Sequence, residues 1–343
     1  MTVRDEIFEQ PAVIARLLDR GRERIAGIAR AVSDHDPDHV VIAARGTSDH
    51  AAIYAQYLLG VAHRLPVALA APSIRSLYGV EPRFGRTLVI GISQSGASPD
   101  VVGVIDAGRR QGAPTIAITN DPTSPLAAAA EHVIDIGAGP ERSIAATKTY
   151  TAELVAVAML SGALAGSPVP PALERLPAEI DRALRTEPEA EAIAAELAGI
   201  RMCTVLGRGF EYATAREWAL KLKELAQVLA DPYSTADFRH GPLALVAAGW
   251  PVFAIVPSGP AAAETGPLLE RLTAAGAEVL AVSDDPAIRR SARRSIALPT
   301  GIAAEYTPVV SIVPAQLLAL HLSLVRGLDP EGPPHIAKVT LTS

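Results

Sequence analysis

The chain has 343 residues, of which 49% are hydrophobic and 20% charged, and its formal net charge is −6. This composition excludes an intrinsically disordered chain, and the negative charge argues against a nucleic acid or an anionic membrane as partner. The length suits two domains of ordinary size. The single cysteine, Cys203, excludes an internal disulfide framework and favours a reducing compartment. Because Cys203 lies in an apolar run, we expect a buried thiol rather than a nucleophile.

Residues 1–30 are predicted to form a helical lead-in, because their apolar residues have the spacing of one helical face: Ile7, Val13, Ile14, Leu17 and Leu18. The N-terminus lacks the basic segment and apolar run of a secretory leader. No segment is predicted to be long and apolar enough to cross a bilayer. We therefore expect a cytoplasmic protein.

Five short apolar runs in the first half are predicted to be buried strands, because each is bounded by turn residues. They are His39–Ala44, Pro66–Ala70, Leu88–Ile92, Thr115–Thr119 and Val133–Ile136. Predicted helices follow the first run through Leu59, the third run from Pro99 to about Gln111, and the last run from Ser143 to Leu164. Alternating strands and helices indicate an α/β fold with a parallel sheet covered on both faces.

A hydroxyl-rich loop follows the central strand. Ser93, Gln94, Ser95 and Ser98 supply side-chain donors, and Gly96 allows a tight turn before the helix that begins at Pro99. Such a joint points N–H groups and hydroxyls at one place, where the helix dipole favours negative charge. The loop therefore indicates a phosphate site, and the alternative is a serine-rich helix cap without a ligand.

The second half repeats the plan of the first. Arg45-Gly46 and Ser95-Gly96 recur as Arg208-Gly209 and Ser258-Gly259, in both cases 163 residues later. We place the repeats at 31–170 and 194–333, joined by a linker at 171–193 and followed by a tail at 334–343. Where the first repeat has Ser93-Gln94-Ser95, the second has Val256-Pro257-Ser258. We therefore expect the anion loop in the first repeat alone.

The second repeat carries the segment EWALKLKE. On a helix, Glu217, Lys221 and Glu224 share one face, beside an apolar stripe of Trp218, Leu222, Leu225 and Leu229. The alternative is a solvated Glu–Lys pair of the kind common on helix surfaces.

Two further candidates lie in less regular segments. His240 is predicted to lie in a Gly/Pro loop, YSTADFRHGP, where a histidine is either functional or a simple hydrogen-bonding residue. Lys338 lies between apolar residues near the C-terminus, and its alternative is a surface lysine on a fraying tail. Because none of the eight histidines has metal-ligand spacing, we expect no metal.

Eight motifs, in order along nearly the whole chain, resemble the sugar isomerase (SIS) superfamily. They are EIFEQP at Glu6–Pro11, GTS at Gly46–Ser48, SQSG at Ser93–Gly96, ATK at Ala146–Lys148, LGRG at Leu206–Gly209, ALKLKE at Ala219–Glu224, HGPLAL at His240–Leu245 and AK at Ala337–Lys338. The resemblance is closest to the isomerase half of glucosamine-6-phosphate synthase and to stand-alone class II glucosamine-6-phosphate deaminases. It implies two tandem SIS-type, flavodoxin-like, three-layer αβα domains related by internal duplication.

The resemblance also implies roles for individual residues, without a cofactor. Glu224 would move a proton between C1 and C2, with Glu217 and Lys221 orienting substrate and base. His240 would assist ring opening from the neighbouring subunit of a homodimer, and Lys338 would form a Schiff base with the keto sugar. The residues expected to bind the substrate and its phosphate are Gly46, Thr47, Ser48, Ser93, Gln94, Ser95, Ser98, Ile144 and Ala145.

Two departures from the family pattern lie near the expected substrate. Ala146 stands where the family has a serine, and Leu229–Asp231 stands where it has HAE. Both bear on the identity of the substrate more than on the type of reaction.

The sequence also lacks the glutaminase part of the synthases. We therefore expect deamination of an amino-sugar phosphate, with glucosamine-6-phosphate as the best guess, to fructose-6-phosphate and ammonia. The alternatives are an ammonia-dependent fructose-6-phosphate aminotransferase, a fructosamine-phosphate deglycase and, in another class, a non-catalytic sugar-phosphate sensor.

Overall fold

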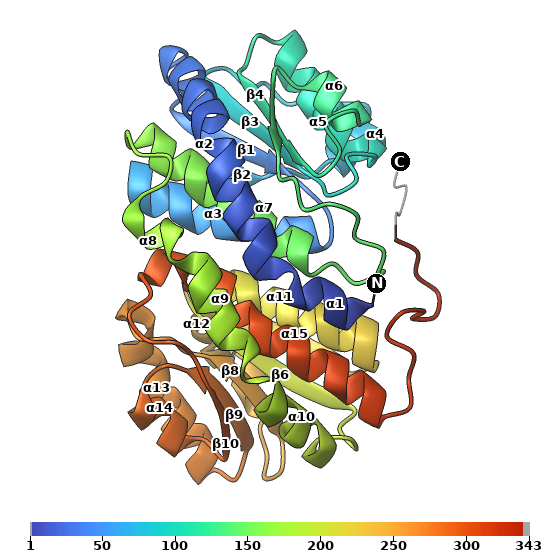
Figure 1. Ribbon diagram of the computed structural model, residues 1–343, viewed down its shortest axis with the longest axis vertical. Coiled ribbons are helices and arrows are strands. Elements are labelled where there is room, and N and C mark those ends of the chain that lie inside the picture. The colour runs from blue at the N-terminus through green and yellow to red at the C-terminus, as the bar shows by residue number, and fades with distance from the viewer. Residues whose placement is uncertain (1, 339–343) are drawn as a thin grey trace. The chain divides into compact units, whose positions relative to one another are not determined.

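The computed structural model describes residues 2–338 (Figure 1). Within them the chain forms two compact units, each with one five-stranded sheet. The β1–β5 unit consists of residues 12–142, 148–175 and 336–338. The β6–β10 unit consists of residues 2–11, 143–147 and 176–335. Each unit is therefore assembled from segments that are distant in the sequence.

The sheet of the β1–β5 unit is parallel throughout and has the strand order β2-β1-β3-β4-β5. Every residue of β3 and β4 is buried, as we expect for strands covered on both faces. The predicted apolar runs therefore become the strands β1 (His39–Ala43), β2 (Val67–Leu69), β3 (Thr87–Ile92), β4 (Thr115–Thr119) and β5 (His132–Asp135).

The helices of this unit form two groups. Helix α3 packs against α7, while α5 packs against α4 and α6, and Figure 1 shows these groups on opposite sides of the sheet. This placement follows from right-handed crossovers that leave the centre of the sheet in both directions. The helices are α2 (Gln10–Asp34), α3 (Thr47–His63), α4 (Ser73–Ser76), α5 (Pro99–Arg110), α6 (Pro125–Ala129), α7 (Lys148–Leu164) and α8 (Pro171–Glu174).

The sheet of the β6–β10 unit is also parallel, with the order β10-β9-β8-β6-β7. Read from the other edge, this order is that of the first sheet, with β6 in the place of β1. The predicted fold class, two similar α/β domains with parallel sheets, is therefore confirmed. The strands are β6 (Met202–Gly207), β7 (Leu229–Ser234), β8 (Pro251–Ile255), β9 (Glu278–Ser283) and β10 (Arg294–Ala297).

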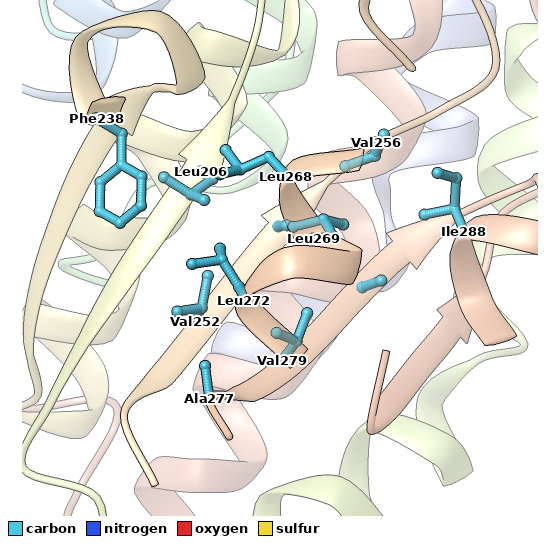
Figure 2. Packing of buried hydrophobic residues seen from close by; sticks show 12 residues of the cluster. Leu206, Phe238, Val252, Val256, Leu268, Leu269, Leu272, Ala277, Val279 and Ile288 are labelled. Atoms are coloured by element: carbon cyan, nitrogen blue, oxygen red, sulfur yellow. The ribbon is translucent and has the colours of Figure 1, made fainter. Parts of the chain in front are cut away.

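One hydrophobic core cluster of this unit lies between its sheet and α13. Figure 2 shows Leu268, Leu269 and Leu272 of α13 lying over Val252 and Val279 of the central strands, and all five are buried. The helices of the unit are α1 (Val3–Phe8), α9 (Leu176–Leu184), α10 (Glu187–Glu196), α11 (Glu211–Ala226), α12 (Thr235–Arg239), α13 (Pro260–Ala274), α14 (Pro286–Ser291) and α15 (Thr307–Val325), with 3-10 turns at η1 (Pro242–Leu245) and η2 (Ala304–Tyr306).

Several local predictions differ from the structure. The segment YSTADFRHGP is not one loop, because it contains the end of β7 and helix α12. Helix α7 begins at Lys148 rather than at Ser143. Residues 171–193, predicted as a linker, hold α8, α9 and most of α10. Leu229 does not continue the stripe of α11, because that helix ends at Ala226 and Leu229 is 66% exposed at the start of β7.

The prediction that no segment could cross a bilayer was wrong for α15. The stretch Ala304–Val325 has 22 residues and a mean hydropathy of 1.8, which is sufficient by length and composition. However, 83% of its apolar window is buried, and α15 packs against α9, α10 and α11. A helix enclosed on several sides is apolar all round because it lies in a protein core, so the composition alone is weak evidence of a membrane span.

Candidate functional site

The loop of residues 93–98, here called the serine loop, connects β3 to α5 at the carboxyl end of the sheet. Gly96 has φ +60°, and a Cβ atom there would lie 2.1 Å from the Ser124 Oγ atom, so glycine is required. Ser93 Oγ accepts a hydrogen bond from the Gly96 N–H at 3.1 Å, and Ser95 Oγ accepts one from the Ala97 N–H at 3.3 Å. These bonds fix the turn and use both hydroxyl oxygens as acceptors.

Ser98 is the N-cap residue of α5, but its side chain makes no capping hydrogen bond to that helix. The Ser98 hydroxyl is therefore not used as a helix cap. Asp100 in the first turn is buried and is paired with Arg45, whose guanidinium nitrogens lie 2.6 and 2.7 Å from one carboxylate oxygen. This pair offsets the one negative charge at the start of α5, so it does not repel an anion at the loop.

The Gly46-Thr47-Ser48 segment lies at the same edge of the sheet, because β1 and β3 are adjacent and paired in parallel up to Ala43 and Gly91. Gly46 has φ +56° and precedes α3. The Ser48 hydroxyl donates to Glu153 Oε1 of α7 at 2.8 Å, and both residues are buried. Sequence reasoning missed Glu153, because it is 105 residues away from Ser48 in the sequence and its segment resembles any buried helix.

Ile144 and Ala145 belong to residues 143–147, which are part of the β6–β10 unit. Ala145 is buried, and Ile144 is half-buried. The neighbouring Ser143 N–H lies 3.3 Å from both carboxylate oxygens of Glu6, and its hydroxyl lies 3.2 Å from Glu331. These contacts hold the segment in place beside α1.

Helix α11 carries the predicted face of Glu217, Lys221 and Glu224, here called the Glu–Lys–Glu row. The Lys221 ammonium lies 3.3 Å from Glu217 Oε1 and 2.5 Å from Glu224 Oε2. Glu217 and Lys221 side chains are fully buried, whereas the Glu224 side chain is 20% exposed. The alternative of a solvated surface pair is therefore wrong.

The electrostatics of the row follow from this burial. Burial alone would lower the pKa of Lys221, but the carboxylates of Glu217 and Glu224 outweigh it and raise the pKa above its ordinary value. Lys221 is thus a permanent cation between two carboxylates. Glu224 is therefore the member of the row whose side chain is accessible from solvent.

His240 is the C-cap residue of α12, and its backbone N–H donates to the Asp237 carbonyl at 3.0 Å. The residue is exposed, so its imidazole is accessible from solvent within this chain. The following Gly241 has φ +148°, which only glycine adopts readily.

Lys338 lies at the end of the described chain, within the β1–β5 unit. Its ammonium is 2.7 Å from Glu141 Oε2, its side chain is 23% exposed and that of Glu141 is fully buried. Lys338 is thus anchored rather than part of a fraying tail. Sequence reasoning missed Glu141, which is 197 residues away.

The second repeat has no equivalent of the serine loop. The Ser258 N–H donates to Asp284 Oδ1 at 2.6 Å, so the protein's own carboxylate occupies the donor that an anion would need. Cys203 is buried, and burial raises the pKa of its thiol, so it is unsuited to be a nucleophile. Among residues 2–338, no group of three or more His, Cys, Asp or Glu residues could hold a metal ion.

Comparison with known proteins gives two matches of the SIS domain family model, over residues 35–162 and 196–326. The glutamine–fructose-6-phosphate aminotransferase (isomerizing) of Methanothermobacter thermautotrophicus is 36% identical over 336 residues. That alignment covers 97% of this chain and 56% of the relative. The chain therefore spans little more than half the length of this curated relative.

Two solved structures are similar over nearly the whole chain. One, from Silicibacter pomeroyi, is provisionally named a phosphosugar isomerase; it is 36% identical, with a TM-score of 0.87, over 96% of this chain and 100% of that one. The other is the C-terminal domain of glucosamine-fructose-6-phosphate aminotransferase from Francisella tularensis, 26% identical, with a TM-score of 0.84, over 96% and 98%. Since the family model also matches more than half of the residues, the resemblance seen in the motifs is confirmed, and this chain belongs to the SIS domain family.

Proposed function

We propose that this chain is a phosphosugar isomerase that acts on an amino-sugar phosphate. The observation that carries the proposal is the Glu–Lys–Glu row, in which a buried cation holds one partly exposed carboxylate, Glu224. Membership of the SIS family and the names of its relatives support the same class of substrate. The proposed reaction converts glucosamine-6-phosphate and water to fructose-6-phosphate and ammonia.

The proposed roles divide the reaction into binding and proton transfer. The serine loop, with Gly46, Thr47 and Ser48, would bind the phosphate, because hydroxyls and helix N-terminal N–H groups favour an anion. Ile144 and Ala145 would contact the sugar through their backbone. Glu224 would carry a proton between C1 and C2 of the open-chain sugar.

Ring opening and carbonyl activation need further groups. His240 would protonate or deprotonate the ring oxygens, and we propose that it does so in the partner subunit of a homodimer. Lys338 would form an imine with the C2 carbonyl. Glu217 and Lys221 would hold the Glu224 carboxylate in place. We further propose that the protein is cytoplasmic, where sugar phosphates are available.

A second candidate is the reverse reaction, in which ammonia and fructose-6-phosphate give glucosamine-6-phosphate. It is favoured by the relatives, which are named as isomerizing aminotransferases. A third variant, deglycation of a fructosamine phosphate, uses the same groups. The combination of GRGF at 207–210 with SDH at 48–50 resembles the deaminases more than the synthases, and it favours the first direction.

The test is a panel of substrates with the purified protein. Ammonia release is measured with glucosamine-6-phosphate, its epimers and fructosamine-6-phosphate, and the reverse reaction with fructose-6-phosphate and ammonium. We expect turnover with at least one aldose–ketose pair and none with the corresponding sugars that lack phosphate. No turnover in either direction with any compound would contradict the proposal.

The same panel distinguishes an enzyme from a sugar-phosphate sensor. A sensor would bind glucosamine-6-phosphate, measured by calorimetry, without converting it. For an enzyme, Glu224→Gln keeps binding and loses turnover, because the amide has the shape of the carboxylate but cannot carry the proton.

A further inference from the structure

We propose that Glu141 is the positioning residue for Lys338, and that it also holds the proton that Lys338 must lose before it can act as a nucleophile. The inference rests on the proposed imine-forming role of Lys338. It concerns a group with no part in the serine loop or in the Glu–Lys–Glu row. All the contacts that carry it lie within the β1–β5 unit.

The Glu141 carboxylate is held in place by contacts other than the one with Lys338. Its Oε1 accepts the Thr149 N–H at 3.2 Å, and its Oε2 accepts the Thr149 hydroxyl at 2.8 Å. Thr149 is in the first turn of α7, a helix of 17 residues, so the carboxylate lies at the positive end of the helix dipole. The preceding carbonyl, of Pro140, accepts a hydrogen bond from the buried Lys148 ammonium at 2.7 Å. Both the side chain and its backbone are therefore fixed.

Lys338 comes to this carboxylate from an irregular segment. Residues 328–338 contain no helix or strand, so the backbone there has few hydrogen bonds of its own to fix the lysine. The 2.7 Å contact to Glu141 Oε2 is a charge-assisted bond to a side chain that is fully buried. Lys338 itself keeps 23% of its side chain exposed, so the lysine is not enclosed as Glu141 is. Glu141 is thus a fixed, buried acceptor, and Lys338 is a partly exposed donor. This arrangement is expected for a lysine that must be oriented and must also reach a substrate.

The chemistry needs a proton acceptor at this place. An ammonium has no lone pair, so Lys338 must first transfer one proton to the Glu141 carboxylate. The neutral amine then attacks the C2 carbonyl carbon of the open-chain keto sugar, the C–N bond forms, and the carbonyl electron pair moves to oxygen. That oxygen then takes one proton from the nitrogen and the proton held by Glu141, and it leaves as water. The product is the protonated imine. No oxidant, reductant or further reactant is needed.

Two measurements on the full-length chain test the inference. The first is native trypsin cleavage after Lys338, followed by mass spectrometry, because a lysine held by Glu141 is protected from the protease. The second is trapping of fructose-6-phosphate on Lys338 by cyanoborohydride, which reduces the imine to a stable adduct. The variant is Glu141→Gln. The matched control is Glu81→Gln, which removes the charge of a surface carboxylate in the same unit, 2.6 Å from Arg110.

In Glu141→Gln we expect cleavage after Lys338 to be about tenfold faster and trapping about tenfold slower, the change for the loss of one charge-assisted hydrogen bond. In Glu81→Gln both rates should match the wild type. In Glu141→Ala, added formate should restore trapping, whereas chloride at the same ionic strength should not, because only formate supplies a carboxylate. If Glu141→Gln does not fold, Thr149→Val weakens the same carboxylate and should change both rates in the same directions by a few-fold.

The outcomes distinguish the positioning role of Glu141, its proton-holding role and the role of Lys338. Unchanged cleavage and trapping in Glu141→Gln overturn the inference. Faster cleavage with unchanged trapping shows a docking contact only and overturns the proton-holding role. Absence of any trapping in the wild type overturns the proposed role of Lys338, and this inference with it, while the cleavage rates still report whether Glu141 holds the lysine.

Discussion

Replacement of Lys221 by methionine is the sharpest test of the Glu–Lys–Glu row. The substitution keeps an unbranched side chain but leaves two carboxylates, 3.3 and 2.5 Å from the lost ammonium, without their shared cation. Removal of one partner of a buried ion pair costs about 3–5 kcal/mol of unfolding free energy. Because the Glu224 side chain is 20% exposed and thus partly solvated, we expect the lower end, about 3 kcal/mol at pH 7.

The assay is urea unfolding followed by tryptophan fluorescence. Both tryptophans, Trp218 and Trp250, lie in the β6–β10 unit, so the signal reports on the unit that carries the row. The double variant Glu217→Gln, Lys221→Met should recover part of the loss, because it no longer buries an uncompensated charge.

The control for this experiment is Lys223→Met, two residues along the same helix at an exposed position. We expect its unfolding free energy to stay within about 0.5 kcal/mol of the wild type. If Lys221→Met behaved like Lys223→Met, the row would not be an electrostatic unit, and the argument that Lys221 fixes Glu224 would fail.

Three further outcomes are expected. The pKa of Lys221 is raised in the folded chain. The stabilisation that Lys221 contributes is therefore complete below its ordinary pKa of 10.5 and is lost as the pH rises through the pKa of the folded state. Urea midpoints should accordingly fall only above about pH 10.5. Gly96→Ala should destabilise the β1–β5 unit by about 2–4 kcal/mol, because φ is left-handed there and the added Cβ clashes with Ser124. Gly112→Ala should cost only about 1–2 kcal/mol, because Gly112 has φ +76° but open space around it. Thermal melts compare the two variants. Glu224→Gln should lower turnover by about 10²–10⁴-fold while the dissociation constant of the sugar phosphate, measured by calorimetry, is unchanged.

The strands and the duplicated plan could be predicted because they depend on local pattern. Strands β1, β3 and β4 are short apolar runs between turn residues, and burial on both faces requires that composition. The serine loop was also visible, since Gly96 and its hydroxyl neighbours are adjacent in the chain. What sequence could not decide was whether Glu217 and Lys221 are buried, because the helix face alone fits a solvated pair equally well.

The missed residues are those whose role depends on distant partners. Glu141 meets Lys338 across 197 residues, and Glu153 meets Ser48 across 105 residues. No local period or motif links such pairs, and each carboxylate lies in a segment that otherwise looks like loop or buried helix. In the same way, the end of α11 at Ala226 could not be read from an apolar spacing that continues to Leu229.

The duplication explains why the row can be buried at all. With the separation of 163 residues that relates the repeats, Glu217, Lys221 and Glu224 correspond to Tyr54, Leu58 and Val61 of α3. Those residues are 0%, 4% and 69% exposed, so the fold already gives two enclosed positions and one open position on this helix. The second repeat keeps that pattern of burial and has charged side chains where the first has uncharged ones. Since uncharged residues fill the same places in the first repeat, packing does not require charges there, and their presence in the second repeat fits the role proposed for Glu224.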